Sequence, residues 1–242
     1  MGNSIEEGLS ASTASPGEIA SDIRMLELQT ANAFFVGNPQ SKSGEWVLVD
    51  TGPENSGDFI GKEAEKRFGK GSRPKAIILT HGHSNHAGSA KRLSGLWNVP
   101  VYLHPMEMPL IGCPAVPLPK DSSVPGMPGW CWIHTPGHTE GHIALFRERD
   151  GMLIAGDALA VAEQKTWMPA DTQGGQNGEP TRHPEADRKK GRESICRIKD
   201  LDPCMIFPGH GRPMKGDEVP GRLKYLADHF GESLSGVCGI GS

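Results

Sequence analysis

The chain has 242 residues and a formal net charge of −4 at pH 7, with acidic and basic residues mixed along its length. A single α/β core of this size can bury most of its apolar surface, although two small domains would also fit. The sequence has no basic stripe, which argues against nucleic acid as a partner. It has no apolar run near the roughly 18 residues of a membrane span and no signal-peptide pattern, so we expect neither insertion nor export.

The sequence contains five cysteines, an odd number, and no Cys-x-x-Cys pair. This pattern argues for reduced thiols in a cytoplasmic protein and against a zinc site built on cysteine. The 32 glycines and 20 prolines indicate many tight turns and few long helices.

Small and polar residues fill positions 1–20, where we expect a flexible lead-in. We expect a single domain over residues 21–230 and a flexible, glycine-rich tail over residues 231–242. The domain begins with three strand patterns separated by turn residues, which together predict an antiparallel meander. These strands are expected at residues 23–28, 33–37 and 46–49.

After the meander, helical and strand patterns alternate. Apolar residues at helical spacing, followed by Gly69, predict a helix over residues 58–68. A strand–helix–strand unit follows, with strands at 76–79 and 101–104 and a helix at 86–96. This alternation favours a layered α/β fold.

The second half opens with a proline-rich segment, residues 105–130, which predicts an irregular loop that could form a substrate wall. The elements beyond it repeat the order of the first half, which is consistent with a pseudo-symmetric sandwich. They are strands at 131–134, 142–147 and 152–155, a helix at 184–198, a strand at 205–207 and a helix at 219–230.

Three histidines, His81, His83 and His86, lie within six residues, directly after the predicted strand at 76–79. The whole sequence has only ten histidines, so this clustering argues against three unrelated surface or core residues. Because a strand end followed by a helix can direct several imidazoles to one side, the spacing predicts half of a metal site.

Three further candidate ligands, His138, Asp157 and His210, follow later predicted strands. Each lies beside a glycine that allows the chain to turn. Any one of them alone would be interpreted as a turn residue. Their shared position after a strand end makes the set specific.

Together these segments resemble the metallo-β-lactamase fold hydrolases. The resemblance implies an α/β fold of four layers, an αββα sandwich with metals at one edge between the two sheets. The matching motifs are Val49-Asp50-Thr51-Gly52, Thr80-His81-Gly82-His83-Ser84-Asn85-His86, Pro136-Gly137-His138, Gly156-Asp157 and Pro208-Gly209-His210.

Carried over position by position, the resemblance implies a site for two metals. The implied ligands are His81, His83 and His138 for the first metal, His86 and His210 for the second, and Asp157 between them. Asp50 corresponds to a carboxylate that supports the histidine loop without binding a metal. We expect zinc, although these ligand types also suit iron or manganese.

One position departs from the family pattern His-x-His-x-Asp-His, because Asn85 stands where the aspartate belongs. A neutral amide is a poor ligand for a dication and cannot carry a proton to a leaving group. We therefore expect one firmly bound metal, a weakened second metal and slow turnover. Asn85 marks either a natural mononuclear or altered enzyme or an engineered substitution, the second slightly favoured because every other motif is intact.

The resemblance implies hydrolysis, in which a metal-bound hydroxide attacks a carbonyl carbon and the positions of Asn85 and Asp157 take part in catalysis. Family branches with a glutathione-binding domain, an RNA-processing insertion or a tyrosine near the metals match this sequence poorly. We therefore expect a small-molecule substrate, namely a carboxylic ester, lactone or thioester, with a β-lactam as a further option. Trp167 and Met168 are candidate pocket residues.

Two alternatives stay open. One is a non-catalytic metal-binding or ligand-binding protein of the same fold, which the amide of Asn85 makes more credible. The other is a redox diiron protein of this fold, but that branch carries a glutamate where this chain has His83. The oligomeric state, monomer or homodimer, also stays open.

Overall fold

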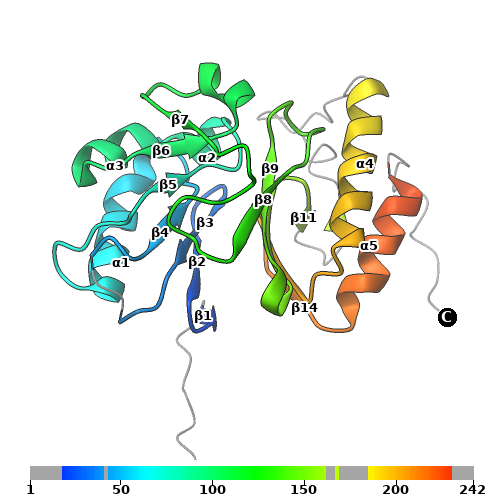
Figure 1. The fold of residues 1–242 in the computed structure, drawn as a ribbon, viewed down its shortest axis with the longest axis horizontal. Helices are drawn as coiled ribbons and strands as arrows, with labels where there is room; N and C mark the ends of the chain where they lie inside the picture. The colour runs from blue at the N-terminus through cyan, green and yellow to red at the C-terminus, as the bar shows by residue number, and fades with distance from the viewer. Residues whose placement is uncertain (1–17, 41–42, 162–166, 169–184, 231–242) are drawn as a thin grey trace, which may run out of the picture.

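The computed structural model describes residues 18–40, 43–161, 167–168 and 185–230. The expected tail and most of the expected lead-in lie outside these ranges. Within them, two large β-sheets pack face to face, and helices cover the outer face of each sheet (Figure 1). The first half of the chain forms one sheet with its helices, and the second half forms the other (Figure 1).

The first sheet has seven strands in sequence order, antiparallel from β1 to β4 and parallel from β4 to β7. The antiparallel part is the predicted meander. The strands are β1 (Glu18–Ala20), β2 (Ile23–Glu27), β3 (Asn32–Val36), β4 (Val47–Val49), β5 (Ile77–Ile78), β6 (Val101–Leu103) and β7 (Val116–Pro117).

The second sheet has five strands in the order β14-β13-β10-β9-β8, with β10 and β13 parallel. Its strands are β8 (Trp130–His134), β9 (Ile143–Arg147), β10 (Met152–Gly156), β13 (Met205–Pro208) and β14 (Met214–Lys215). A separate antiparallel pair is formed by β11 (Ala160–Val161) and β12 (Trp167–Met168).

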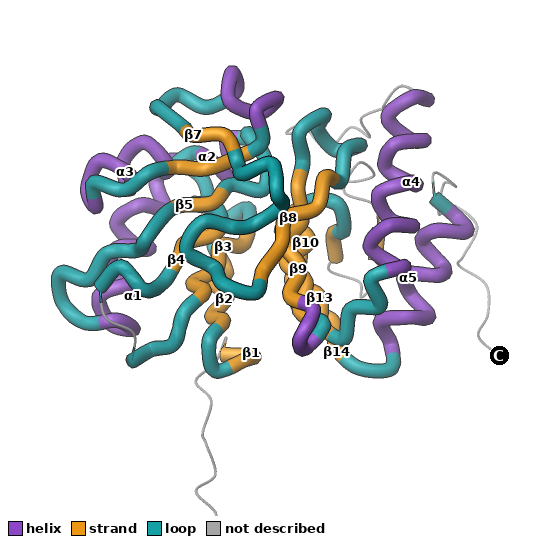
Figure 2. The backbone as a smooth tube through the Cα atoms, viewed as in Figure 1, coloured by secondary structure: helices purple, strands orange, loops and turns teal. Residues whose placement is uncertain are grey.

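The helices lie on the two outer faces, α1 and α3 beside the first sheet and α4 and α5 beside the second (Figure 2). Their bounds are α1 (Gly57–Phe68), α2 (Ser84–Ala87), α3 (Ala90–Trp97), α4 (Glu185–Asp200) and α5 (Glu218–His229). Short 3₁₀ turns are η1 (Glu54–Ser56), η2 (Pro105–Leu110) and η3 (Glu148–Asp150). No helix in the described ranges has both the length and the hydropathy that a bilayer crossing requires.

Three apolar clusters join the four layers, because the strands are buried on both faces. On β3, Phe34 faces the cluster between the two sheets, whereas Phe35 faces the cluster under α1 and α3. On β9, Leu145 faces the cluster between the sheets and Ala144 faces the cluster under α4 and α5. Alternate residues of a strand point to opposite faces, which explains why these strands are apolar at consecutive positions. The predicted αββα sandwich is confirmed.

Three local predictions differ from the structure. The strand β1 lies inside the expected lead-in, because its backbone pairs with β2. The helix predicted over residues 86–96 is broken between α2 and α3 at Gly88 and Ser89, where the Ser89 hydroxyl donates to the carbonyls of Pro53 and Glu54. The segment at 105–130, expected to be irregular, contains η2 and β7.

Candidate metal centre

The candidate ligands come from loops that follow strands of both sheets and meet at one rim of the sandwich. The histidine loop follows β5, His138 lies between β8 and β9, Asp157 follows β10 and His210 follows β13. Because β10 and β13 run parallel, the residues after them leave the sheet at the same end. The tertiary structure thus brings together all six side chains that the sequence predicts as ligands.

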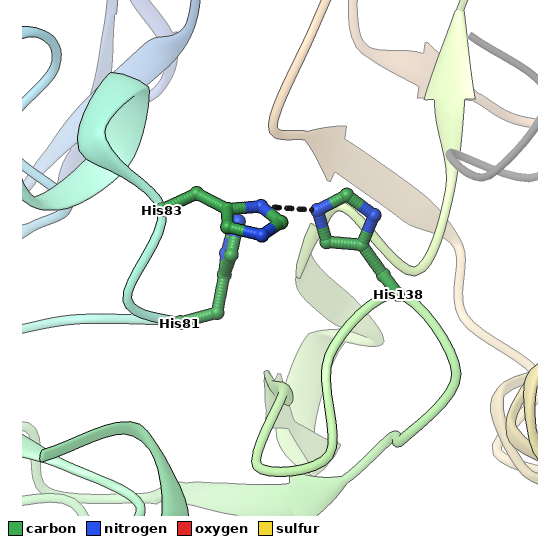
Figure 3. A group of neighbouring side chains, drawn as sticks. All are labelled: His81, His83 and His138. Carbon is green, nitrogen blue, oxygen red and sulfur yellow. Dashed lines mark hydrogen bonds between the residues drawn. The ribbon is translucent and has the colours of Figure 1, made fainter. Parts of the chain in front are cut away.

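His81, His83 and His138 form the first group of donors, with ring nitrogens that lie within 4.8 Å of one another. Figure 3 shows the three rings turned toward a common point from two separate loops. The Nδ1 atom of His83 lies 2.9 Å from the Nε2 atom of His138. His81 is fully buried, whereas His83 is exposed, so the group opens to solvent on one side.

His81, His86 and Asp157 form the second group, which is entirely buried and also spans no more than 4.8 Å. The Nε2 atom of His86 lies 3.1 Å from Asp157 Oδ1. The Nε2 atom of His210 lies 3.1 Å from Asp157 Oδ2 and 3.3 Å from His86 Nε2. Asp157 also lies 3.2 Å from the Nε2 atom of His138, so its carboxylate sits between the two groups.

Asp50 determines which ring nitrogens are free to bind a metal. Its Oδ2 atom lies 2.9 Å from Nδ1 of His86 and accepts the hydroxyl proton of Thr80 at 2.8 Å. The Thr80 oxygen lies 3.1 Å from Nδ1 of His81. Because the hydroxyl hydrogen already points to Asp50, the oxygen can only accept here, so Nδ1 of His81 is the donor. Both imidazoles therefore carry a proton on Nδ1, which leaves Nε2, on the side of Asp157, as the nitrogen that can bind a metal.

The charge states of these groups favour cation binding. Burial and the nearby His86 lower the pKa of His81 well below its ordinary value, and burial lowers the pKa of His138 to about 4. Although burial opposes it, the charge of His86 holds the pKa of Asp157 well below its ordinary range. At neutral pH, His81 and His138 are therefore neutral imidazoles beside the carboxylate of Asp157.

His86 differs from the other buried histidines. Although burial acts in the opposite direction, Asp157 and Asp50 raise the pKa of His86 to about 10. Without a cation, His86 therefore carries the positive charge that compensates Asp157. A bound cation would take over this compensation, so binding should release a proton.

The donor set passes a test of fit for a metal. Among the residues that the structure describes, the buried Nε2 atom of His81 has no hydrogen-bond partner, and Asp157 Oδ2 lies 3.8 Å from it. An unpartnered polar atom in a protein interior is costly, so such atoms in a native structure indicate a missing partner. Imidazole and carboxylate donors in two adjoining groups suit a divalent transition metal.

Asn85, at the aspartate position of the family pattern, lies beside the second group. Its Nδ2 atom is 3.4 Å from the Nε2 atom of His210. The side chain is therefore placed where an aspartate would meet the second metal, but it carries no charge.

Two residues without a predicted site role support the rim. His142 is fully buried, and its Nε2 atom accepts the backbone N–H of Asp157 at 2.9 Å, while its Nδ1 atom lies 2.8 Å from the Thr135 hydroxyl. Burial and the nearby His138 lower the pKa of His142 to about 3, so the ring stays neutral. The second residue, Glu107, accepts hydrogen bonds from backbone N–H groups of the two loops that carry His83 and His138. The only sequence signal for it is a lone charge in an apolar segment, Pro105–Leu110.

The described residues test the expected pocket walls only in part. A cavity of about 630 Å³ adjoins the histidine loop at Gly82 and Ser84 and is walled by Leu110, Ile111 and Cys113. These three residues belong to the proline-rich segment at 105–130, for which a role as a substrate wall stays a prediction. Trp167 and Met168 form β12 beside β11, but their side chains lie outside the described part of the structure.

A comparison with known families and proteins extends this picture. Residues 27–210 match the family model described as the metallo-beta-lactamase superfamily. The chain is 36% identical over 245 residues to the probable metallo-hydrolase YflN of Bacillus subtilis, an alignment that covers 88% of this chain and 92% of the relative.

Solved structures show the same architecture. The metallo-beta-lactamase family protein TTHA1429 of Thermus thermophilus aligns with a TM-score of 0.61 at 22% identity, over 86% of this chain and 78% of that protein. The protein TTHA1623, solved in a di-iron-bound form, aligns with a TM-score of 0.58 at 25% identity, over 85% of this chain and 96% of that protein.

Proposed function

The chain belongs to the metallo-β-lactamase superfamily and is a metallo-hydrolase, and on this premise we propose that it cleaves a small carboxylic ester, lactone or thioester, with a β-lactam as a further option. The observation that carries the proposal is the pair of donor groups around Asp157, each within 4.8 Å. We assign the first ion to His81, His83 and His138, the second to His86 and His210, and the shared position to Asp157.

When bound, the metal ions would supply Lewis acidity and an activated water molecule near neutral pH. The protein prepares for this chemistry through its own hydrogen bonds. Asp50 holds a proton on Nδ1 of His86 directly, and through the Thr80 hydroxyl it holds the proton of His81 on Nδ1. His142 accepts the backbone N–H of Asp157 and thereby fixes the main chain that carries the carboxylate. Burial of these groups keeps water away from His81, His86 and Asp157, whereas His83, His138 and His210 are open to solvent.

The cavity beside the histidine loop is our candidate for the pocket that receives the substrate. Its walls combine apolar side chains, Leu110 and Ile111, with the backbone next to His83. The apolar side chains suit the acyl or ring portion of a small ester, lactone or thioester, and Glu54, Ser84 and Arg92 add polar groups to the lining. Lys91 also lines the cavity and would attract a carboxylate on such a substrate.

We further propose that Asn85 limits the reaction. A neutral side chain adds no negative charge to His86, His210 and Asp157, so the second metal is held less firmly than the first. The amide also has no titrating oxygen that could pass a proton to the leaving group. The protein would therefore bind substrate but turn it over slowly.

One other function has support from the same residue. A non-catalytic metal-binding or ligand-binding protein could keep the ligands of the first group and dispense with the proton donor at position 85. The two functions differ in one respect: only an enzyme has a hydrolytic rate that rises when the missing carboxylate is supplied.

The experiment compares the wild-type protein with Asn85→Asp after loading with zinc, iron or manganese. We expect elemental analysis to give about one firmly bound zinc in the wild type and two in Asn85→Asp. On a panel of esters, lactones, thioesters and β-lactams, we expect Asn85→Asp to react about 10²- to 10⁴-fold faster, the usual contribution of general acid–base catalysis.

A matched control is Asn38→Asp, which adds the same charge at an exposed loop position remote from the rim. This variant should behave like the wild type. Equal hydrolysis by the wild type and Asn85→Asp would refute the proposed role of Asn85. Inactivity of both on the whole panel, with metal bound, would favour the non-catalytic alternative.

A further inference from the structure

Glu107 is a carboxylate inside the protein that contacts two separate loops. It lies in η2, and only 1% of its surface is exposed. Its Oε2 atom accepts the backbone N–H of Gly82 at 2.8 Å, and its Oε1 atom accepts the backbone N–H of Gly141 at 2.7 Å. Both oxygens are therefore engaged by groups from different parts of the chain.

The two N–H groups belong to the loops that carry the first group of donors. Gly82 lies between His81 and His83, and Gly141 follows His138 by three residues. The histidine loop extends from the first sheet and the His138 loop from the second, so Glu107 connects the two halves of the sandwich at the rim.

The packing around both glycines shows that η2 approaches the loops as closely as atoms allow. A β-carbon on Gly82 would lie 2.7 Å from the Cβ atom of Leu110. A β-carbon on Gly141 would lie 2.8 Å from Oε1 and Cγ of Glu107 and 2.8 Å from Nδ1 of His104. Any larger residue at either position would push its loop away from Glu107.

The chemistry of the side chain explains why a glutamate serves here. A buried charge is costly unless it is paired or hydrogen-bonded. A glutamine could accept at one oxygen only, and its NH₂ group would then face the other N–H. A carboxylate is thus the side chain of this length that can accept from both loops at once.

We infer that Glu107 is a positioning residue that holds the two loops at the spacing required by the first group of donors, so that it sets the affinity of His81, His83 and His138 for a divalent cation. The inference rests on the proposed function, because it concerns the same metal site. It assigns Glu107 little influence on His86 and Asp157, since Asp50 holds the ring of His86 and His142 holds the main chain of Asp157.

The test uses Glu107→Gln, with Glu63→Gln as the matched control. Glu63 is also a buried glutamate, 7% exposed, but it lies in α1, where it pairs with Arg24 and Lys66. Zn²⁺ and Co²⁺ are titrated into each metal-free protein. For Glu107→Gln we expect the first equivalent to bind about 10- to 100-fold more weakly, as when other supporting residues of metal sites are replaced. We also expect the Co²⁺ absorption spectrum to change.

A second readout does not depend on metal. Hydrogen exchange at the amides of Gly82 and Gly141 is measured in the metal-free proteins, where we expect faster exchange of at least one amide in Glu107→Gln and no change in Glu63→Gln. Gly141→Ala keeps the carboxylate of Glu107 in the sequence but places a β-carbon 2.8 Å from its Oε1 atom, so it should push the loop away and weaken the first equivalent in the same way. It serves in place of Glu107→Gln if that variant fails to fold.

The inference is overturned if the first equivalent binds to Glu107→Gln as tightly as to the wild type, or if Glu63→Gln loses the same affinity. A wild-type protein without affinity for Zn²⁺ or Co²⁺ would overturn the proposed function and the statement on affinity together. In that case, hydrogen exchange at the amides of Gly82 and Gly141 still tests whether Glu107 holds the two loops in place.

Discussion

Gly209 lies so close to Asp157 that a β-carbon at position 209 would overlap the Oδ1 atom of the carboxylate. The same β-carbon would lie 2.9 Å from Cε1 of His86. The glycine before His210 therefore does more than let the chain turn after β13. It leaves the space in which the bridging carboxylate and an imidazole of the second group meet.

Gly209→Ala should displace Asp157 and disrupt the second group of donors. Because overpacking forces neighbouring atoms to shift, we expect a loss of ~1–3 kcal/mol in the free energy of unfolding. We also expect fewer bound metal ions, measured by elemental analysis. The control is Gly95→Ala in α3, where nothing lies within 4 Å of the added β-carbon and the helix should gain ~0.5–1 kcal/mol. Equal metal content in Gly209→Ala and the wild type would contradict the crowding argument.

Asp50→Asn should weaken both groups of donors, because Asp50 accepts hydrogen bonds from Thr80 and His86. The amide would leave at least one buried donor unsatisfied, at a cost of ~1–3 kcal/mol in the free energy of unfolding. Metal affinity should fall about 10- to 100-fold, as is usual when a residue that orients a ligand is changed. Denaturant unfolding and metal titration measure the two effects. Asp58→Asn, which changes an exposed carboxylate paired with Arg92, should alter neither.

His104→Asn should make stability less sensitive to acid. Burial lowers the pKa of His104 from 6.5, and the ring of His134, stacked at a centroid distance of 4.6 Å, acts in the same direction, whereas Glu107 opposes it. Because the folded protein takes up this proton less readily than the unfolded chain, the contribution of His104 is present above pH 6.5 and is lost as the pH falls below it.

The free energy of unfolding of the metal-free protein is measured at about pH 7.5 and about pH 5.5, on either side of the ordinary histidine pKa. We expect the wild type to lose more stability over this interval than His104→Asn does. Asparagine can still accept the N–H of Met106 at the start of η2, so the turn should be kept. The exposed control His229→Asn should follow the wild type. A pH dependence that is the same in all three proteins would rule out a contribution of His104.

Removal of metal should destabilise the protein by an amount that depends on the free metal concentration. A ligand that binds only the folded state at about 100 times its Kd contributes ~2.7 kcal/mol, so excess chelator should lower the Tm measurably. The stabilising effect of added zinc should be much smaller in His83→Ala, which loses an exposed donor of the first group. His229→Ala should keep the full effect, since His229 lies in α5 away from the rim. A Tm that does not respond to chelator or zinc would argue against the assigned ligands.

Local sequence patterns predicted much of the fold because they reflect burial. Strands such as β3 and β9 are apolar at consecutive positions, since both their faces are covered. This run of apolar residues can be recognised in the sequence without knowing which strands or helices pack against it. The break between α2 and α3 was missed because it depends on Ser89 bonding to Pro53 and Glu54, which lie more than 30 residues away. No local pattern contains that contact.

The sequence by itself determined the types of metal-binding donor and their positions after strand ends. Both depend only on short segments such as Thr80–His86 and Pro208–His210, which contain the donor side chains and the glycines of the turns. Only the tertiary structure decided how these donors are used. The protons on Nδ1 of His81 and His86 depend on Asp50, which binds His86 and Thr80, the main chain of Asp157 is held by His142, and the spacing of the histidine loops depends on Glu107. Each of these is a hydrogen bond between segments that are distant in the chain, and its geometry exists only once the two sheets have packed together.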